Sequence, residues 1–147
     1  MSRIEALKNY VIGVLEDILT DDTFKMNVDF LSNEINSYSI DKIPTSSVIE
    51  KCLNDEEVHK EVYLIRSRFF YGEDESNNLS NIGFYETLEE TIRRKNDRGE
   101  LPNIEGIEEI TCLNCGSINN VETNTAEFNM QIQITYRINN NTNIVSI

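Results

Sequence analysis

The chain has 147 residues, of which 26 are Asp or Glu and 13 are Lys or Arg, so its formal net charge is −13 at pH 7. Hydrophobic residues make up 39% and charged residues 27%, a composition close to that of globular domains that argues against intrinsic disorder. Nucleic-acid binding depends on clustered Lys and Arg, so the acidic balance argues against a surface of that kind.

The length predicts a single domain over residues 1–147. The first residues contain no basic stretch followed by an apolar run, and no segment approaches the roughly 18 apolar residues of a membrane-spanning helix. Three cysteines, Cys52, Cys112 and Cys115, cannot all pair within one chain, which favours a reducing compartment. We therefore expect a soluble, intracellular protein.

The first predicted elements are a helix and a strand. Ser2 and Glu5 form a capping-box pattern, and apolar residues then recur at three- and four-residue spacing as far as Ile18, which is typical of an amphipathic helix. Apolar and polar residues alternate over 24–30, which predicts a half-buried strand.

The next predicted elements are a long connection and a central strand. Residues 32–57 show no lasting period, so we expect a connection with one short strand around 40–43. Aromatic and β-branched residues dominate 58–70, with the most continuous apolar stretch around Leu64. This predicts a central strand that is covered on both faces near its middle.

A second helix is predicted from apolar residues that recur between positions 79 and 92, followed by basic residues at 93–95 that suit the negative end of a helix dipole. The apolar stripe of this helix consists of Leu79, Ile82, Tyr85, Leu88 and Ile92.

Two further strands are predicted, at 107–113 and 125–138. The last has the clearest pattern, because even-numbered apolar residues alternate with odd-numbered polar ones; the polar side is either solvated or faces a neighbouring subunit. From about 139 we expect a flexible tail, or an arm that becomes ordered on assembly. The predicted fold class is α+β, a mixed, mostly antiparallel sheet flanked by two main helices.

A catalytic or metal site is weakly supported by the residue pattern. Cys112 and Cys115 have C-x-x-C spacing, but neither Cys52 nor the single histidine, His59, is arranged with them as a zinc ligand. A redox pair would normally open a helix, whereas this one lies in a strand-like segment. His59 has no pattern of nucleophile and base around it, and the acidic runs lack the oxygen-ligand alternation of a calcium loop. We therefore predict no cofactor, no metal and no enzymatic activity.

Arg66 and Arg68 precede three aromatic residues at 69–71. Arginine interleaved with aromatic residues can stack on bases, but the acidic balance of the chain favours arginines paired to carboxylates at a subunit interface. A core strand with two solvated arginines is the equal alternative.

Four ordered blocks of the sequence resemble a family of small proteins from the tail modules of phages and prophages of low-GC Gram-positive bacteria. The blocks are YLIRSRFFYGED at 63–74, NIGFYE at 81–86, RGELP at 98–102 and AEFNMQIQITY at 126–136. In these blocks the chain is similar to tail terminator (tail completion) proteins. The connection at 32–57 shows the least likeness.

The resemblance implies a structural protein that forms a ring, typically a hexamer, on the last ring of tail tube protein and stops further polymerisation. It implies an outer surface that meets neck or connector proteins, or the collar of a headless contractile bacteriocin. Such a ring assembles in the bacterial cytoplasm and remains in the virion or tail-like particle, and DNA passes through it without specific binding. Within the matching blocks, the positions expected at ring or tube contacts are Arg66, Arg68, Glu73, Asp74, Phe84 and Tyr85.

Two alternatives stay open. The chain could be an assembly adaptor or chaperone that leaves the finished particle, or a small thiol or metal enzyme that uses Cys112 and Cys115.

Overall fold

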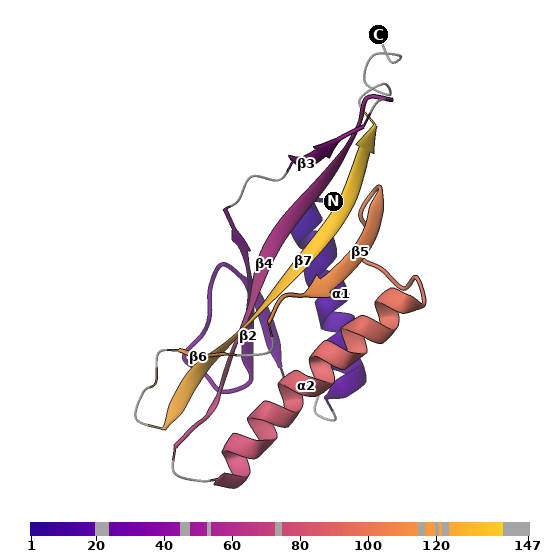
Figure 1. The fold of residues 1–147 in the computed structure, drawn as a ribbon. Helices are drawn as coiled ribbons and strands as arrows, with labels where there is room; N and C mark the ends of the chain where they lie inside the picture. Colours follow the sequence, from indigo (N-terminus) through magenta and orange to yellow (C-terminus); the bar gives the residue numbers. More distant parts are fainter. Residues whose placement is uncertain are drawn as a thin grey trace.

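The structure, a computed structural model, describes residues 1–19, 24–44, 48–52, 54–72, 75–114, 117–119, 121 and 124–139. The predicted tail beyond Asn139 therefore lies outside the described residues. In chain order the elements are α1 (Arg3–Ile18), β1 (Lys25–Val28), β2 (Ser37–Ile43), β3 (Val48–Lys51), β4 (Glu56–Phe70), α2 (Glu75–Asp97), β5 (Ile107–Cys112), β6 (Ser117–Asn119) and β7 (Thr125–Asn139) (Figure 1).

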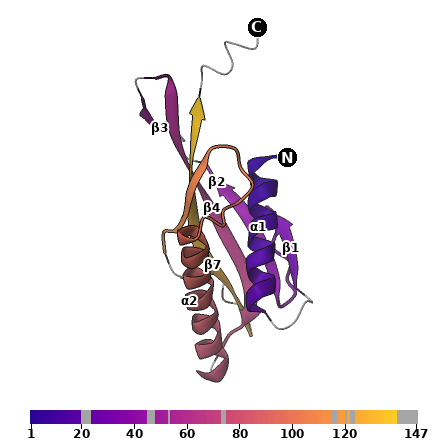
Figure 2. The ribbon, with the colours of Figure 1, turned by 90° about the vertical axis from the view of Figure 1, so that its right-hand side faces the viewer.

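The described strands form one seven-stranded sheet in the order β1-β2-β4-β7-β5, with β3 paired to β4 and β6 paired to β7. β1 pairs with β2 in parallel, and the other pairings of these strands are antiparallel. Both helices cover the same face of the sheet (Figure 2). The predicted α+β fold, with a mixed and mostly antiparallel sheet and two helices, is confirmed.

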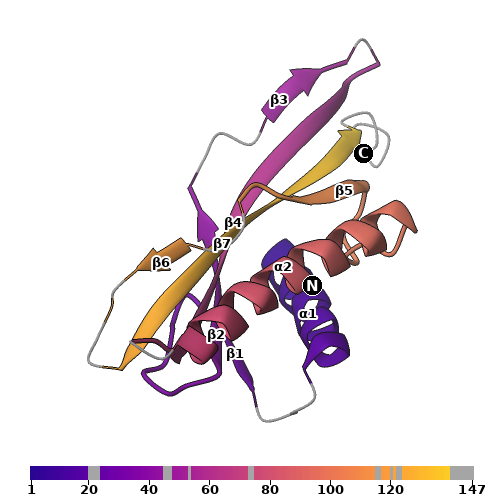
Figure 3. The same cartoon turned by 60° about the horizontal axis from the view of Figure 1, so that its bottom comes forward.

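The opposite face of the sheet, which no described helix covers, is called the helix-free face below. It consists of the even-numbered residues of β4, the odd-numbered residues of β7 and their register partners on the neighbouring strands. β4 and β7 are each 15 residues long and pair from one end to the other. Together with β3 they project beyond the helices (Figures 1 and 3).

The hydrophobic core lies between the sheet and the two helices. It contains Tyr63 and Ile65 of β4, the even-numbered apolar residues of β7, and the inner sides of α1 and α2. An aromatic cluster built around Phe69, with Tyr38 and Phe128 among its members, closes one end of this core. Burial of these large side chains is the main source of stability for the layer arrangement.

The structure confirms the predicted start and inner side of α1. Ser2 is the N-cap, and its Oγ accepts a hydrogen bond of 3.2 Å from the backbone N–H of Glu5. Leu7, Val11 and Leu15 are fully buried, as the three- and four-residue spacing predicted.

The predicted inner stripe of α2 is partly wrong. Tyr85, Leu88 and Ile92 are buried, but Leu79 is 60% exposed and Ile82 is 55% exposed. The buried side at this end of the helix instead includes Asn81, whose Nδ2 donates to the carbonyl of Phe70. The prediction counted apolar residues, whereas here an amide with a backbone partner takes the inner position.

The connection predicted at 32–57 is partly wrong. The short strand expected around 40–43 lies within β2, but β2 is longer, and the segment also contains β3 and the start of β4. β2 begins at Ser37, and Ser37 and Ser39 are buried. Ser39 is satisfied locally, since its Oγ donates to Asp41 and accepts from the N–H of Phe30. Serine that finds such partners can occupy a buried strand, which apolar periodicity does not reveal.

Two expectations for other strands need correction as well. β1 is shorter than the predicted segment 24–30, and Phe30 beyond it is exposed. Leu64, expected under cover on both faces of β4, lies half-buried on the helix-free face, because Tyr63 and Ile65 beside it point into the core.

Gly106 is required by a close backbone approach. Its φ is +76°, and a Cβ built there would lie 2.1 Å from the carbonyl oxygen of Arg137. The carbonyl of Gly106 accepts a 2.9 Å hydrogen bond from the N–H of Arg137. A glycine at this position therefore lets the loop before β5 join the edge of β7.

Candidate interaction surface

Arg66 is at the centre of a charged cluster on the helix-free face. Its Nε lies 2.6 Å from Asp41 Oδ2, and its Nη1 lies 3.0 Å from Glu127 Oε1. Asp41 and Glu127 come from β2 and β7, the two strands that flank β4. The Arg66 and Asp41 side chains are about one-fifth exposed, while Glu127 is buried. The carboxylate pairing expected for Arg66 thus occurs within one chain.

Arg68 lies on the same face and is buried. Its Nε donates a 3.1 Å hydrogen bond to the carbonyl of Ser32, and its own carbonyl accepts one from the N–H of Asn36. Arg68 therefore attaches the segment between β1 and β2 to the sheet. The solvated arginine of the alternative interpretation is not found at this position.

The remaining positions expected at contacts are placed differently. Phe84 is half-buried and packs on Phe69, with ring centroids 5.3 Å apart. Tyr85 is only 3% exposed, and its hydroxyl donates to the carbonyl of Phe128 and forms a hydrogen bond with Ser67 Oγ. Tyr85 therefore links α2 to β4 and β7 from inside the core. Glu73 and Asp74 lie outside the described residues.

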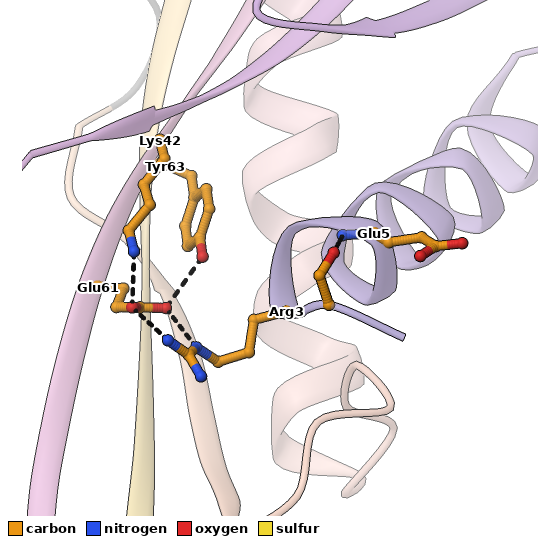
Figure 4. Close-up of polar contacts among 6 residues, drawn as sticks. Arg3, Glu5, Lys42, Glu61 and Tyr63 are labelled. Atoms are coloured by element: carbon orange, nitrogen blue, oxygen red, sulfur yellow. Dashed lines mark hydrogen bonds and ion pairs between the residues drawn. The ribbon is translucent and has the colours of Figure 1, made fainter.

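A second charged cluster, around Glu61, lies on the helix side of the sheet (Figure 4). Glu61 is 2% exposed, and both of its oxygens accept hydrogen bonds. Arg3 donates from Nε at 2.8 Å and from Nη2 at 3.0 Å, Lys42 Nζ donates at 3.0 Å, and Tyr63 Oη donates at 3.0 Å. The guanidinium of Arg3 also lies over the ring of Tyr136, 4.8 Å from its centroid.

This environment keeps Glu61 ionised. Burial by itself would raise the pKa of Glu61, but the hydrogen bonds from Arg3, Lys42 and Tyr63 outweigh it and lower the pKa from 4.5 to about 2. Burial, followed by the charge of Glu61, raises the pKa of Tyr63. A carboxylate with four donors and so low a pKa is suited to fixing the first turn of α1 to the sheet and unsuited to exchanging protons near neutrality.

The Glu61 cluster was missed at the level of the sequence, although two signals were present. Glu61 occupies an inward position of β4 between His59 and Tyr63, where a lone carboxylate requires partners. Arg3 is a basic residue in the first turn of a helix, which the helix dipole disfavours unless another interaction compensates.

His59 and Cys112 lie in strands of the sheet. His59 stacks on Tyr136 with ring centroids 5.2 Å apart, and its Nε2 lies 3.2 Å from Glu57 Oε1. Cys112 is half-buried at the end of β5, as the strand-like segment predicted, while Cys115 lies outside the described residues. No group of three or more His, Cys, Asp or Glu residues in the described part of the chain is arranged to hold a metal ion.

An open cleft of about 630 Å³ lies between the start of α1, the loop at 103–106 and the end of β7. Its two arginines are engaged in contacts within the chain. Arg3 binds Glu61, and Arg137 lies 3.0 Å from Glu56 and 3.2 Å from Glu108. These contacts hold the start of α1 and the end of β7 in place.

Neither the scan against protein-family models nor the search of curated proteins finds a match to this chain. Among the described residues, neither helix has the length and apolar character needed to cross a membrane.

Proposed function

We propose that this chain is a structural ring-forming protein that caps the end of a phage tail tube, or of the tube of a phage-tail-like bacteriocin, and ends its polymerisation. The single observation that carries the proposal is that three of the four blocks of family resemblance, far apart in the sequence, meet in space. Blocks 63–74 and 126–136 contain most of β4 and β7, which pair with each other, and block 81–86 lies on α2 against them.

Side-chain contacts join these blocks directly. Arg66 of the first block binds Glu127 of the last, and Tyr85 of the second binds Phe128 of the last. Residues that form such contacts determine the relative positions of β4, β7 and α2. The resemblance therefore concerns the framework of the fold, which is where a shared ring-forming shape would be encoded.

The proposed mechanism is passive. A growing tube presents an end that recognises the next ring, and a ring that matches that end but does not offer a new one stops growth. Contacts between unlike surfaces close into a ring when the rotation per subunit divides a full turn. Two charged clusters support this function because they fix the shape of the subunit: the Arg66 cluster joins β2, β4 and β7, and the Glu61 cluster joins α1 to β2 and β4.

The test is to delete the gene in the bacterium that encodes it, induce particle production and measure tube lengths by electron microscopy. We expect tubes of irregular and excessive length, restored to uniform length by the wild-type gene. Tubes of normal length without the protein would refute the proposal. The protein should also be present in purified particles in stoichiometric amounts at one end of the tube. Its absence from finished particles would favour the adaptor or chaperone instead.

A further inference from the structure

The helix-free face differs in charge from the rest of this acidic chain. Its described strand positions carry five positive and five negative side chains, so their net charge is zero, against −13 for the whole chain. The positive side chains are Lys25, Lys60, Arg66, Arg68 and Arg137, and the negative ones are Asp41, Glu50, Glu56, Glu109 and Glu127. Counting Glu108, at the bulge in β5 beside Arg137, changes the sum only to −1.

Half of the charges on this face are also neutralised locally. Arg66 pairs with Asp41 and Glu127, and Arg137 pairs with Glu56. The net negative charge of the described residues therefore lies outside this face. Two copies that approached through those acidic surfaces would repel each other within a screening length of about 8 Å. The helix-free face is a part of the described surface that a second acidic chain can approach without that repulsion.

The centre of the helix-free face has the composition of an interface core. Val62 and Leu64 of β4 lie beside Gln133 and Gln131 of β7, and all four are half-buried and uncharged. Depletion of charged residues is what distinguishes the centre of an interface from ordinary surface. The sheet is also large enough: strands of 15 residues extend about 50 Å, and with the flanking strands the face covers about 700 Å². This lies within the roughly 600–1,000 Å² that each partner of a stable interface buries.

A second feature unexplained within one chain is the exposed apolar pair on α2. Leu79 and Ile82 are spaced as neighbours on a helix and are more than half exposed. Gly83 beside them has no side chain, and a Cβ there would meet no atom within 4 Å. This part of α2 can therefore be approached closely by another surface.

We infer that copies of this chain associate head to tail, with the exposed side of α2 at Leu79 and Ile82 of one copy packed on the helix-free face around Leu64 of the next. The contact covers a bare sheet with a helix, the same layer arrangement that the chain uses internally. It joins unlike surfaces, so it can repeat around a ring. The inference rests on the proposed function only in the expectation that the repeat closes, and it specifies which surfaces the ring would use.

The test uses the purified full chain and sedimentation velocity. We expect the wild-type chain to self-associate at concentrations below about 200 µM, because even a weak specific interface has a dissociation constant in the micromolar range. Leu64→Glu removes one surface and Leu79→Glu removes the other, and each variant alone should associate at least about tenfold more weakly. Val28→Glu, at an exposed apolar residue on the helix side of the edge strand β1, is the matched control and should associate like the wild type. Circular dichroism should show the same fold for all four proteins.

Mixing the two defective variants tests whether the contact joins unlike surfaces of the two copies. Each retains the surface that the other lacks, so the Leu64→Glu chain and the Leu79→Glu chain should form one-to-one dimers and nothing larger. A mixture that stays monomeric while the wild type associates would overturn the head-to-tail contact. A wild-type chain that is monomeric at about 200 µM would also overturn it. Both results are independent of the tube-length experiment, so the failure of either proposal can be recognised separately.

Discussion

Replacing Glu61 by glutamine tests whether its cluster holds α1 on the sheet. The substitution preserves the size of the side chain and removes the negative charge that accepts from Arg3, Lys42 and Tyr63. A pKa lowered from 4.5 to about 2 corresponds to about 3 kcal/mol, because a difference of one in pKa is worth about 1.36 kcal/mol. The Arg3 and Lys42 side chains are 44% and 48% exposed, so solvent screens part of the attraction. We expect Glu61→Gln to lower the free energy of unfolding by about 2 kcal/mol at pH 7.

The pH dependence gives this prediction its specific signature. Because the pKa of Glu61 is lower in the folded state, its stabilising contribution is complete above pH 4.5 and is lost as the pH falls towards 2. The difference between wild type and Glu61→Gln should therefore be constant from pH 7 to about pH 5 and should fall to about half near pH 3.

Urea unfolding followed by circular dichroism at pH 7, 5, 4 and 3 measures this difference. Glu5→Gln is the matched control, because Glu5 is exposed in the first turn of the same helix, and its effect should be small. A Glu61→Gln chain as stable as the wild type at pH 7, or a difference that does not shrink by pH 3, would show that the cluster does not stabilise the fold as described.

Two further predictions concern the backbone and the helix-free face. Gly106→Ala should lower the free energy of unfolding, measured in urea, by about 2 kcal/mol or more, because a Cβ there meets the Arg137 carbonyl at a positive φ. Gly13→Ala in α1 should instead raise it by about 0.5–1 kcal/mol. Equal effects of the two substitutions would contradict the close approach at Gly106. Arg66→Glu should lower the melting temperature, because it places a third carboxylate beside Asp41 and Glu127. Adding Glu127→Arg to this variant should recover part of the loss. An Arg66→Glu chain with the melting temperature of the wild type would argue against the Arg66 cluster.

For Arg66, the structure leads to a different expectation from the sequence alone. Two arginines on a predicted strand of an acidic chain can be solvated or can face a partner, and charge reversal would then leave the monomer folded. The register of β2, β4 and β7 places Asp41 and Glu127 on either side of Arg66. Which carboxylate lies beside which arginine depends on strand order, and strand order is not encoded in any local pattern of residues.

The elements that the sequence by itself determined are those with strong signals: α1 with its Ser2 cap, the core side of β7, and the positions of β4 and α2. Periodicity shows which side of an element is apolar, and in α1 and β7 that apolar side is the side that the core covers. Tertiary structure decided the rest. It placed β2 in the sheet despite its serines, left Leu79 and Ile82 of α2 exposed, and brought Glu61 to the donors that make its burial possible. These outcomes depend on partners far away in the chain, because a buried polar group is tolerated only where such a partner meets it.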